Sequence, residues 1–193
     1  TAHEFQVEEV ELEEPRSDEV LVRIVGAGMC HTDLSVRDSM PFPSAAVLGH
    51  EGAGAVEKVG IDVTEVEPGD HVVLSYLSCG RCKKCLKGHP NYCTDVPQLN
   101  FSGARRDGSS PLSKDGKPLF GAFFNQSSFA SYSLASERNV VKVSKDVPLE
   151  ILGPLACGVM TGAGTVLNAL QVPAGTSIAI FGTGAVGLSA LMA

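Results

Sequence analysis

Four cysteines fall within the fifteen-residue stretch CGRCKKCLKGHPNYC, and only two others, Cys30 and Cys157, occur in the sequence. Two, two and seven residues separate the four: Cys79, Cys82, Cys85 and Cys93. Such close spacing allows a small lobe to turn back on itself and offer four thiolates to a tetrahedral ion. Because four thiolates leave no open position for a substrate, the spacing predicts a structural zinc site that stabilises this lobe.

Three alternative interpretations of the cluster fit the sequence less well. A nucleic-acid-binding zinc ribbon has two ligand pairs separated by a dozen or more residues. An iron-sulfur site has its fourth cysteine three residues on, before proline, whereas Thr94 follows Cys93. Disulfides require export, and no basic region followed by an apolar run stands at the start of the sequence. We therefore expect a reducing, cytoplasmic location.

Composition and charge exclude several classes of partner. The 193 residues are 44% hydrophobic and carry a net charge of -7, which fits a globular protein without a general attraction for nucleic acid or anionic lipid. No charged residue occurs between Ile151 and Ala193, and this length would span a bilayer. Because glycines and prolines interrupt it, we predict a helix buried on most sides and then a buried strand, with no membrane span.

The first half of the chain has strand character. Short β-branched runs bounded by glycine, proline and aspartate occur at 19–28, 54–60 and 69–77, and strand character returns at 125–143. Between them, residues 100–120 are polar and rich in glycine and serine, so we predict a long surface loop.

A second group of metal-binding residue types is spread along the chain. Cys30 lies in MCHTDL, His50 and Glu51 lie in VLGHEGAGAVEKVG, and Cys157 lies in GPLACGVMTG. Singly, a cysteine in an apolar helix is a small buried hydrophobe, and a histidine after glycine is a turn residue. Together, two thiolates and an imidazole suit zinc and leave a fourth position for water or substrate.

Several motifs in order resemble the zinc-dependent medium-chain alcohol dehydrogenases: GHEGAGAVEKVG, CGRCKKCLKGHPNYC and FGTGAVG. FFNQSSFASYSL and PLACGVMTGAGTVLNAL resemble the bacterial aryl-alcohol (benzyl-alcohol) branch of that family. The resemblance implies a mainly β, GroES-like catalytic domain over residues 1–158, with the zinc lobe at 79–93. Residues 159–193 would be a linking helix and the first strand and turn of an α/β Rossmann cofactor domain.

The resemblance also implies two zinc ions per full-length chain, one structural and one catalytic, the latter held by Cys30, His50 and Cys157. Family members are nearly twice as long, so we expect the chain to be part of a longer protein. The fragment alone would be inactive, and the full-length protein would be a homo-oligomer.

The family assigns roles to residues near these ligands. Thr32 matches a hydroxyl that takes the first step of a proton relay, or alternatively is a helix N-cap. Asp33 and Glu51 match carboxylates that hold the histidine ligand; alternatively, Asp33 caps a helix and Glu51 is a solvated acid. Many relatives end the relay on a histidine where this sequence has Ser35, so proton release takes another route.

A nucleotide-binding pattern stands near the end of the chain. SIAIFGTGAVG predicts a strand that runs into Gly182, Gly184 and Gly187, followed by a helix whose N-terminus binds pyrophosphate. The acidic residue that would bind the ribose is expected about 20 residues on, beyond the sequence. The resemblance favours NAD.

His31 matches a pyrophosphate contact or is a surface histidine, and Tyr76 lines the substrate pocket or packs in the core.

These features predict an oxidoreductase that converts a primary aromatic alcohol reversibly to the aldehyde, with hydride transfer to NAD. One alternative is a sister dehydrogenase that acts on formaldehyde adducts, aliphatic alcohols or polyols. A second alternative is a non-catalytic zinc-binding adaptor.

Overall fold

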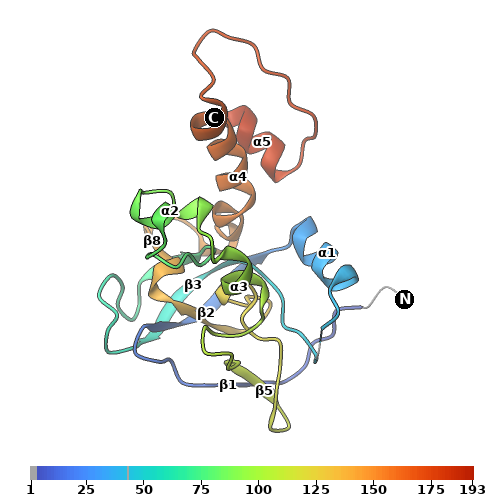
Figure 1. Cartoon of the computed structure of the whole chain (residues 1–193), viewed down its shortest axis with the longest axis vertical. Helices are drawn as coiled ribbons and strands as arrows, with labels where there is room; N and C mark the ends of the chain where they lie inside the picture. The colour runs from blue at the N-terminus through green and yellow to red at the C-terminus, as the bar shows by residue number, and fades with distance from the viewer. Residues whose placement is uncertain (1–3, 43) are drawn as a thin grey trace.

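The computed structural model describes residues 4–42 and 44–193, and its main body is formed by two antiparallel sheets (Figure 1). The larger sheet has the strand order β7-β2-β3-β4-β8, and the smaller has the order β1-β5-β6. The strands of the larger sheet are β2 (Glu19–Gly28), β3 (Glu51–Val59), β4 (His71–Leu74), β7 (Tyr132–Ser136) and β8 (Val140–Val143). Those of the smaller sheet are β1 (Glu11–Leu12), β5 (Leu112–Lys114) and β6 (Lys117–Pro118).

The strands predicted in the first half of the chain are confirmed. Strand β2 runs between β3 and β7, and it places Val20 and Val22 completely out of solvent against Val72 and Leu74. Each such buried side chain stabilises the fold by about 1.5–3 kcal/mol relative to an exposed one. This core holds the ends of β2 and β3 close to each other, where the candidate site begins.

Helical segments are short, and most of them connect the strands. Helix α1 (His31–Ser39) follows β2, and the cysteine lobe contains α2 and η1 (Figure 1). The lobe helices are α2 (Lys83–Leu86) and η1 (Pro90–Tyr92). The other helical segments are α3 (Val96–Phe101), η2 (Phe123–Asn125), η3 (Glu137–Asn139), η4 (Leu149–Ile151), η5 (Gly153–Ala156), α4 (Gly158–Gly164), the π-helix η6 (Thr165–Leu170) and α5 (Ala185–Met192).

The prediction of a surface loop at 100–120 is wrong. This region contains the end of α3 and strands β5 and β6, and it buries Leu112 and Phe120. Arg105 is also buried, because its guanidinium donates two hydrogen bonds to the buried carboxylate of Glu19, at 2.6 and 2.9 Å. The polar composition therefore reflects internal ion pairing and tight turns, which a hydropathy pattern does not distinguish from a solvated loop.

Helices α4 and α5 pack on each other and extend away from the sheets (Figure 1). A Cβ atom at Gly162 would lie 2.8 Å from Ser189, so this contact needs glycine. The predicted burial of this region is wrong, since Met160, Leu167 and Leu170 are exposed. Residues 177–181 form no strand, because no described segment pairs with them. Within residues 4–42 and 44–193, no helix has the length and apolarity to cross a membrane.

Candidate metal centres

Three segments far apart in the sequence bring Cys30, His50 and Cys157 together. Cys30 precedes α1, His50 precedes β3, and Cys157 stands between η5 and α4. His50 Nε2 lies 3.2 Å from Cys30 Sγ and 3.4 Å from Cys157 Sγ. With a carboxylate oxygen of Glu51, the potential ligand atoms all lie within 4.8 Å of one another. The donor set and spacing suit a tetrahedral zinc ion.

Asp33 fixes the orientation of the His50 ring. His50 Nδ1 lies 3.0 Å from Asp33 Oδ1, and both side chains are almost completely buried. Burial lowers the pKa of His50, but the hydrogen bond and charge of Asp33 outweigh burial and raise the pKa overall. With the proton on Nδ1, the lone pair of Nε2 faces the two sulfurs and is available to a metal.

The same carboxylate also holds the segment that carries Cys30. Asp33 Oδ2 accepts a hydrogen bond from the Cys30 backbone at 3.1 Å, and Oδ1 accepts one from Gly49 at 3.2 Å. Cys30 is the N-cap of α1, and its sulfur accepts the backbone N–H of Thr32 at 3.4 Å. Asp33 is therefore both a helix-capping residue and the partner of His50. The alternative that Thr32 is the N-cap is wrong, since Thr32 lies within the first helical turn.

Glu51 lies among the ligand atoms themselves. Its side chain is 3% exposed, so the alternative of a solvated acid is wrong. Burial, followed by a hydrogen bond with Glu51 and the charges of Cys30 and Glu51, raises the pKa of the Cys157 thiol. A bound cation would offset the repulsion between a Cys157 thiolate and the negative charges of Cys30 and Glu51, because a cation favours the thiolate form. A Cβ atom at Gly153 would overlap the Glu51 carbonyl oxygen, so glycine allows η5 to approach β3 here.

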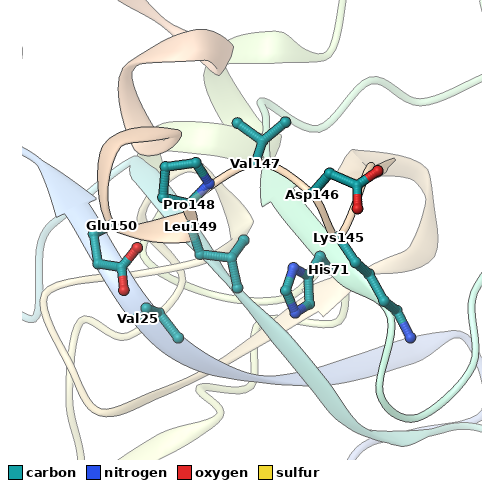
Figure 2. A pocket seen from close by; sticks show the side chains of 8 residues that line it. All are labelled: Val25, His71, Lys145, Asp146, Val147, Pro148, Leu149 and Glu150. Carbon is teal, nitrogen blue, oxygen red and sulfur yellow. The ribbon is translucent and has the colours of Figure 1, made fainter.

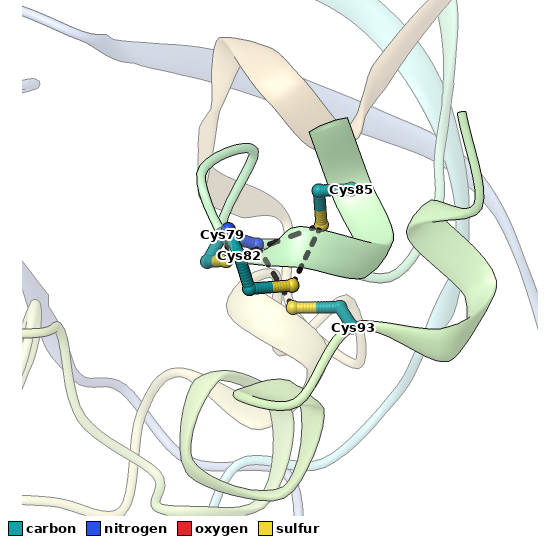
Figure 3. A group of neighbouring side chains, drawn as sticks. All are labelled: Cys79, Cys82, Cys85 and Cys93. Atoms are coloured by element: carbon teal, nitrogen blue, oxygen red, sulfur yellow. Dashed lines mark hydrogen bonds between the residues drawn. The ribbon is translucent and has the colours of Figure 1, made fainter. Parts of the chain in front are cut away.

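The four-cysteine cluster forms a second, separate centre (Figure 3). Cys85 Sγ lies 3.6 Å from Cys82 Sγ and 4.0 Å from Cys79 Sγ, and the four sulfurs lie within 4.8 Å of one another. Backbone N–H groups donate to these sulfurs, including that of Cys82 to Cys79 Sγ at 3.3 Å. Such donors favour thiolates, and they lower the pKa of Cys82 to about 5, whereas burial raises that of Cys85 to about 11.

The glycine-rich turn has part of the predicted geometry. Gly182 has a φ of +108°, in the region that favours glycine, and Gly184 is the N-cap of α5. A Cβ atom at Gly187 would overlap the Gly182 carbonyl oxygen, so the helix passes close to the turn only because glycine is present. His31 is the first residue of α1 and is exposed. Tyr76 is half-buried, and burial and the cysteines Cys85 and Cys93 raise its pKa, which places it beside the lobe.

Comparison with known proteins agrees with this architecture. Residues 16–145 match the family described as the alcohol dehydrogenase GroES-like domain. The chain belongs to the zinc-type medium-chain alcohol dehydrogenase family. Its mainly β body is therefore a GroES-like domain, as the sequence motifs predicted.

Several proteins are closely similar to this GroES-like chain. Geraniol dehydrogenase of Castellaniella defragrans is 54% identical over 96% of this chain and 50% of its own length. The crystal structure of benzyl alcohol dehydrogenase from Acinetobacter calcoaceticus is 53% identical, with a TM-score of 0.88 over 95% of this chain and 49% of its own. S-(hydroxymethyl)glutathione dehydrogenase of Paracoccus denitrificans is 42% identical over 97% of this chain and 51% of its own length. The chain spans about half the length of the relatives it matches.

Sequence reasoning missed two residues beside the first centre of this alcohol dehydrogenase family member. The Phe124 ring stacks on the His50 ring, with centroids 4.7 Å apart and an interplanar angle of 29°. Phe124 has a φ of 50°, which is uncommon for a bulky residue. Gln126 is buried beneath His50 and hydrogen-bonds its carbonyl. The signal was the polar run NQSS directly after two phenylalanines, which is unusual for an ordinary strand.

A shallow hollow on the GroES-like domain contains none of the predicted site residues (Figure 2). It measures about 380 Å³ and lies between β2, β4 and the segment 145–150. His71 Nδ1 is buried at this place and has no hydrogen-bond partner among the described residues. The hollow is a feature of the sheet surface and is distinct from both cysteine-containing centres.

Proposed function

We propose that this chain forms the zinc-binding, catalytic part of an alcohol dehydrogenase. The reaction is the reversible oxidation of a primary aromatic alcohol to the aldehyde, with hydride transfer to NAD. The observation that carries the proposal is the convergence of Cys30, His50 and Cys157 from three distant segments on one small volume.

The donor set of this centre fits a catalytic zinc ion. Two sulfurs and one imidazole nitrogen occupy three positions of a tetrahedron and leave a fourth for an alcohol oxygen. Zinc bound here would supply Lewis-acid chemistry, which lowers the pKa of the alcohol hydroxyl toward neutrality. The cluster at 79–93 offers four sulfurs and no open position, so its zinc would be structural.

Residues near the zinc ligands would orient the histidine and carry away the proton of the substrate hydroxyl. Asp33 keeps a proton on His50 Nδ1 and orients the ring. The Thr32 hydroxyl, on the residue before Asp33 and two residues after Cys30, receives the proton of the substrate hydroxyl and passes its own proton on. Ser35 is exposed on the same helix, where many relatives have a relay histidine, so the proton passes from Thr32 to solvent by a shorter route.

Cofactor binding is assigned to the turn before α5 and to α1. Gly182, Gly184 and Gly187 form a turn that leaves the backbone accessible, and pyrophosphate would bind at the N-terminus of α5. His31 is exposed and would donate a further hydrogen bond to a phosphate oxygen of the bound cofactor.

Aromatic side chains beside His50 support an aromatic substrate. The half-buried Phe124 ring stacks on the His50 ring, with centroids 4.7 Å apart, and the completely buried Phe123 ring supports the His50 ring from the core. A planar substrate packs favourably on an accessible aromatic ring such as that of Phe124. The similarity to a benzyl alcohol dehydrogenase supports the same class, whereas the similarity to geraniol and S-(hydroxymethyl)glutathione dehydrogenases defines the competing substrates.

The test is a panel of alcohol substrates, with NADH formation as the measurement. The enzyme is a protein of the same length as the relatives that contains this chain. We expect a higher kcat/KM for benzyl alcohol than for geraniol, S-(hydroxymethyl)glutathione or ethanol, and loss of turnover in Cys157→Ser. A preference for one of the other alcohols would contradict the aromatic assignment.

Metal analysis of the same preparation separates the enzyme from an adaptor. Two zinc ions per chain, one removed more easily by a chelator, support the enzyme. A single, tightly held ion with no turnover supports a non-catalytic adaptor.

A further inference from the structure

Gln126 is a buried side chain directly beneath the first metal centre. It lies between η2 and β7 and is 2% exposed. Its Oε1 accepts the backbone N–H of Gly52 at 3.1 Å, and its Nε2 donates to the carbonyl of His50 at 3.0 Å. Nε2 also lies 3.1 Å from the carbonyl of Ser75 and 3.3 Å from that of Leu74. One carboxamide therefore connects the start of β3 with the end of β4.

This carboxamide takes the place of a strand-to-strand ladder. The pairing of β3 with β4 runs from Ala55↔His71 to Ala53↔Val73 and goes no further toward His50. Beyond that point, the His50 carbonyl and the Gly52 N–H hydrogen-bond to Gln126 and not to β4. A buried backbone group that loses its partner costs about 1–3 kcal/mol. Gln126 thus fixes the chain on both sides of Glu51.

The backbone of Gln126 is also held in place, through its own carbonyl group. The Ser133 hydroxyl of β7 donates to the Gln126 carbonyl, so the residue is attached to the sheet. A Cβ atom at Gly52 would lie 3.1 Å from Gln126 Oε1 and 2.7 Å from Ser128 Cβ, so the close approach needs glycine at this position. A rigid carboxamide sets the backbone of a neighbouring residue more precisely than water would.

We propose that Gln126 is a positioning residue for the first metal centre. By fixing the His50 carbonyl and the Gly52 amide, it directs His50 Nε2 toward Cys30 Sγ and Cys157 Sγ. The inference rests on the proposed function, because it assumes that these three side chains hold a metal.

The four-cysteine lobe supplies a matched control. Asn100 is also a completely buried carboxamide, and it accepts the backbone N–H of Leu77 at 2.8 Å and donates to the carbonyls of Leu77 and Val96, each at 2.9 Å. Leu77 directly precedes the lobe. Gln126 and Asn100 therefore have the same chemistry and a similar number of buried hydrogen bonds, but each supports a different centre.

The experiment loads the chain with 113Cd and follows the two centres separately by 113Cd NMR and by competition with a chelator. Gln126→Met keeps the length of the side chain and removes its hydrogen bonds. We expect it to shift the resonance of the Cys30, His50 and Cys157 centre and to weaken cadmium binding there roughly tenfold or more, as is typical when an outer partner is lost. The four-cysteine resonance should not move. Asn100→Leu should give the reverse pattern.

The outcomes separate this inference from the proposal on which it rests. If the unaltered chain shows only a four-cysteine resonance, the proposed catalytic centre is wrong. If the unaltered chain shows both resonances, but Gln126→Met leaves the first unchanged or weakens both centres equally, only the role of Gln126 is wrong. If circular dichroism shows that Gln126→Met does not fold, Gln126→Asn, which keeps the amide but shortens its reach, is judged by the same two criteria.

Discussion

The two cysteine-containing centres are assembled in opposite ways. The second centre takes all its sulfurs from residues 79–93, so most of its geometry comes from local turns and backbone N–H groups. The first centre takes its donor atoms from segments separated by 20 and 107 residues, so they meet only when β2, β3 and α4 are in place. A local centre depends on its metal, whereas a dispersed centre depends on the whole fold.

The largest effect is expected at the lobe. Cys79→Ser removes one of four sulfurs from a lobe whose small core consists of Leu77, Leu99 and the cysteines themselves. Zinc contributes about 10–16 kcal/mol to the folding of comparable small peptides. We expect the four-cysteine metal to be lost and trypsin to cut at the exposed Lys83 and Lys84, while the first centre keeps its metal. Loss of both metals would show that the centres are not independent.

A change in the sheets should affect the first centre only. Arg105→Met leaves the buried carboxylate of Glu19 without its charged partner and with only the Arg16 backbone N–H as a donor, which costs about 3–5 kcal/mol. In a urea titration, we expect metal to leave the first centre at a lower urea concentration than in the unaltered protein, with little change at the lobe. Arg23→Met, which removes an exposed ion pair with Glu57, serves as the control and should change little. If both centres lost metal at an equally lowered urea concentration, the conclusion that only the first centre depends on the whole fold would be contradicted.

Asp33→Asn tests how one carboxylate holds both Cys30 and His50 in the first centre. The substitution keeps the shape of the side chain but removes the charge that faces His50 Nδ1. We expect metal affinity at this centre to fall about 10–100-fold, measured by chelator competition, and the lobe to be unaffected. Asp38→Asn, on the same helix but exposed, is the matched control. An unchanged affinity would rule out a role for the carboxylate in holding the histidine.

The smallest effect is expected at Asp70, which lies on the sheet away from both centres. A hydrogen bond from Lys142, followed by one from the Glu67 backbone, lowers the pKa of Asp70 below its ordinary value. Its contribution to stability is therefore present above the ordinary pKa of about 3.9 and is lost as pH falls through the folded value. Asp70→Asn should be less stable than the unaltered chain at pH 7 in urea unfolding, and the difference should shrink in acid, with both metals retained at pH 7.

The sequence predicted the strands and the four-cysteine centre because each has a local signature. The β-branched run at 19–28 matches β2 residue by residue, and the spacing of the four cysteines forces their sulfurs to converge. Cys30, His50 and Cys157 could be grouped only through the family resemblance, since no local pattern relates residues so far apart.

Other features could not be predicted, because their causes are non-local. The polar run at 100–120 folds inward because Glu19, 86 residues away, neutralises Arg105. Gln126 satisfies the backbone of His50 across 76 residues, and only the folded chain shows which carbonyl it meets. The segment 177–181 has strand composition but forms no strand here, since a strand exists only with a neighbour.

Cys157 is the N-cap residue of α4, which packs on α5 and extends with it away from the sheets (Figure 1). Cys30 and His50 are tied to each other through the carboxylate of Asp33, whereas Cys157 lies between η5 and α4. The distance from His50 Nε2 to Cys157 Sγ therefore depends on where α4 begins, whereas the distance to Cys30 Sγ is set by Asp33. An ion bound at the proposed centre would in this way have two donors fixed by one carboxylate and the third placed by the helix that leaves the sheets.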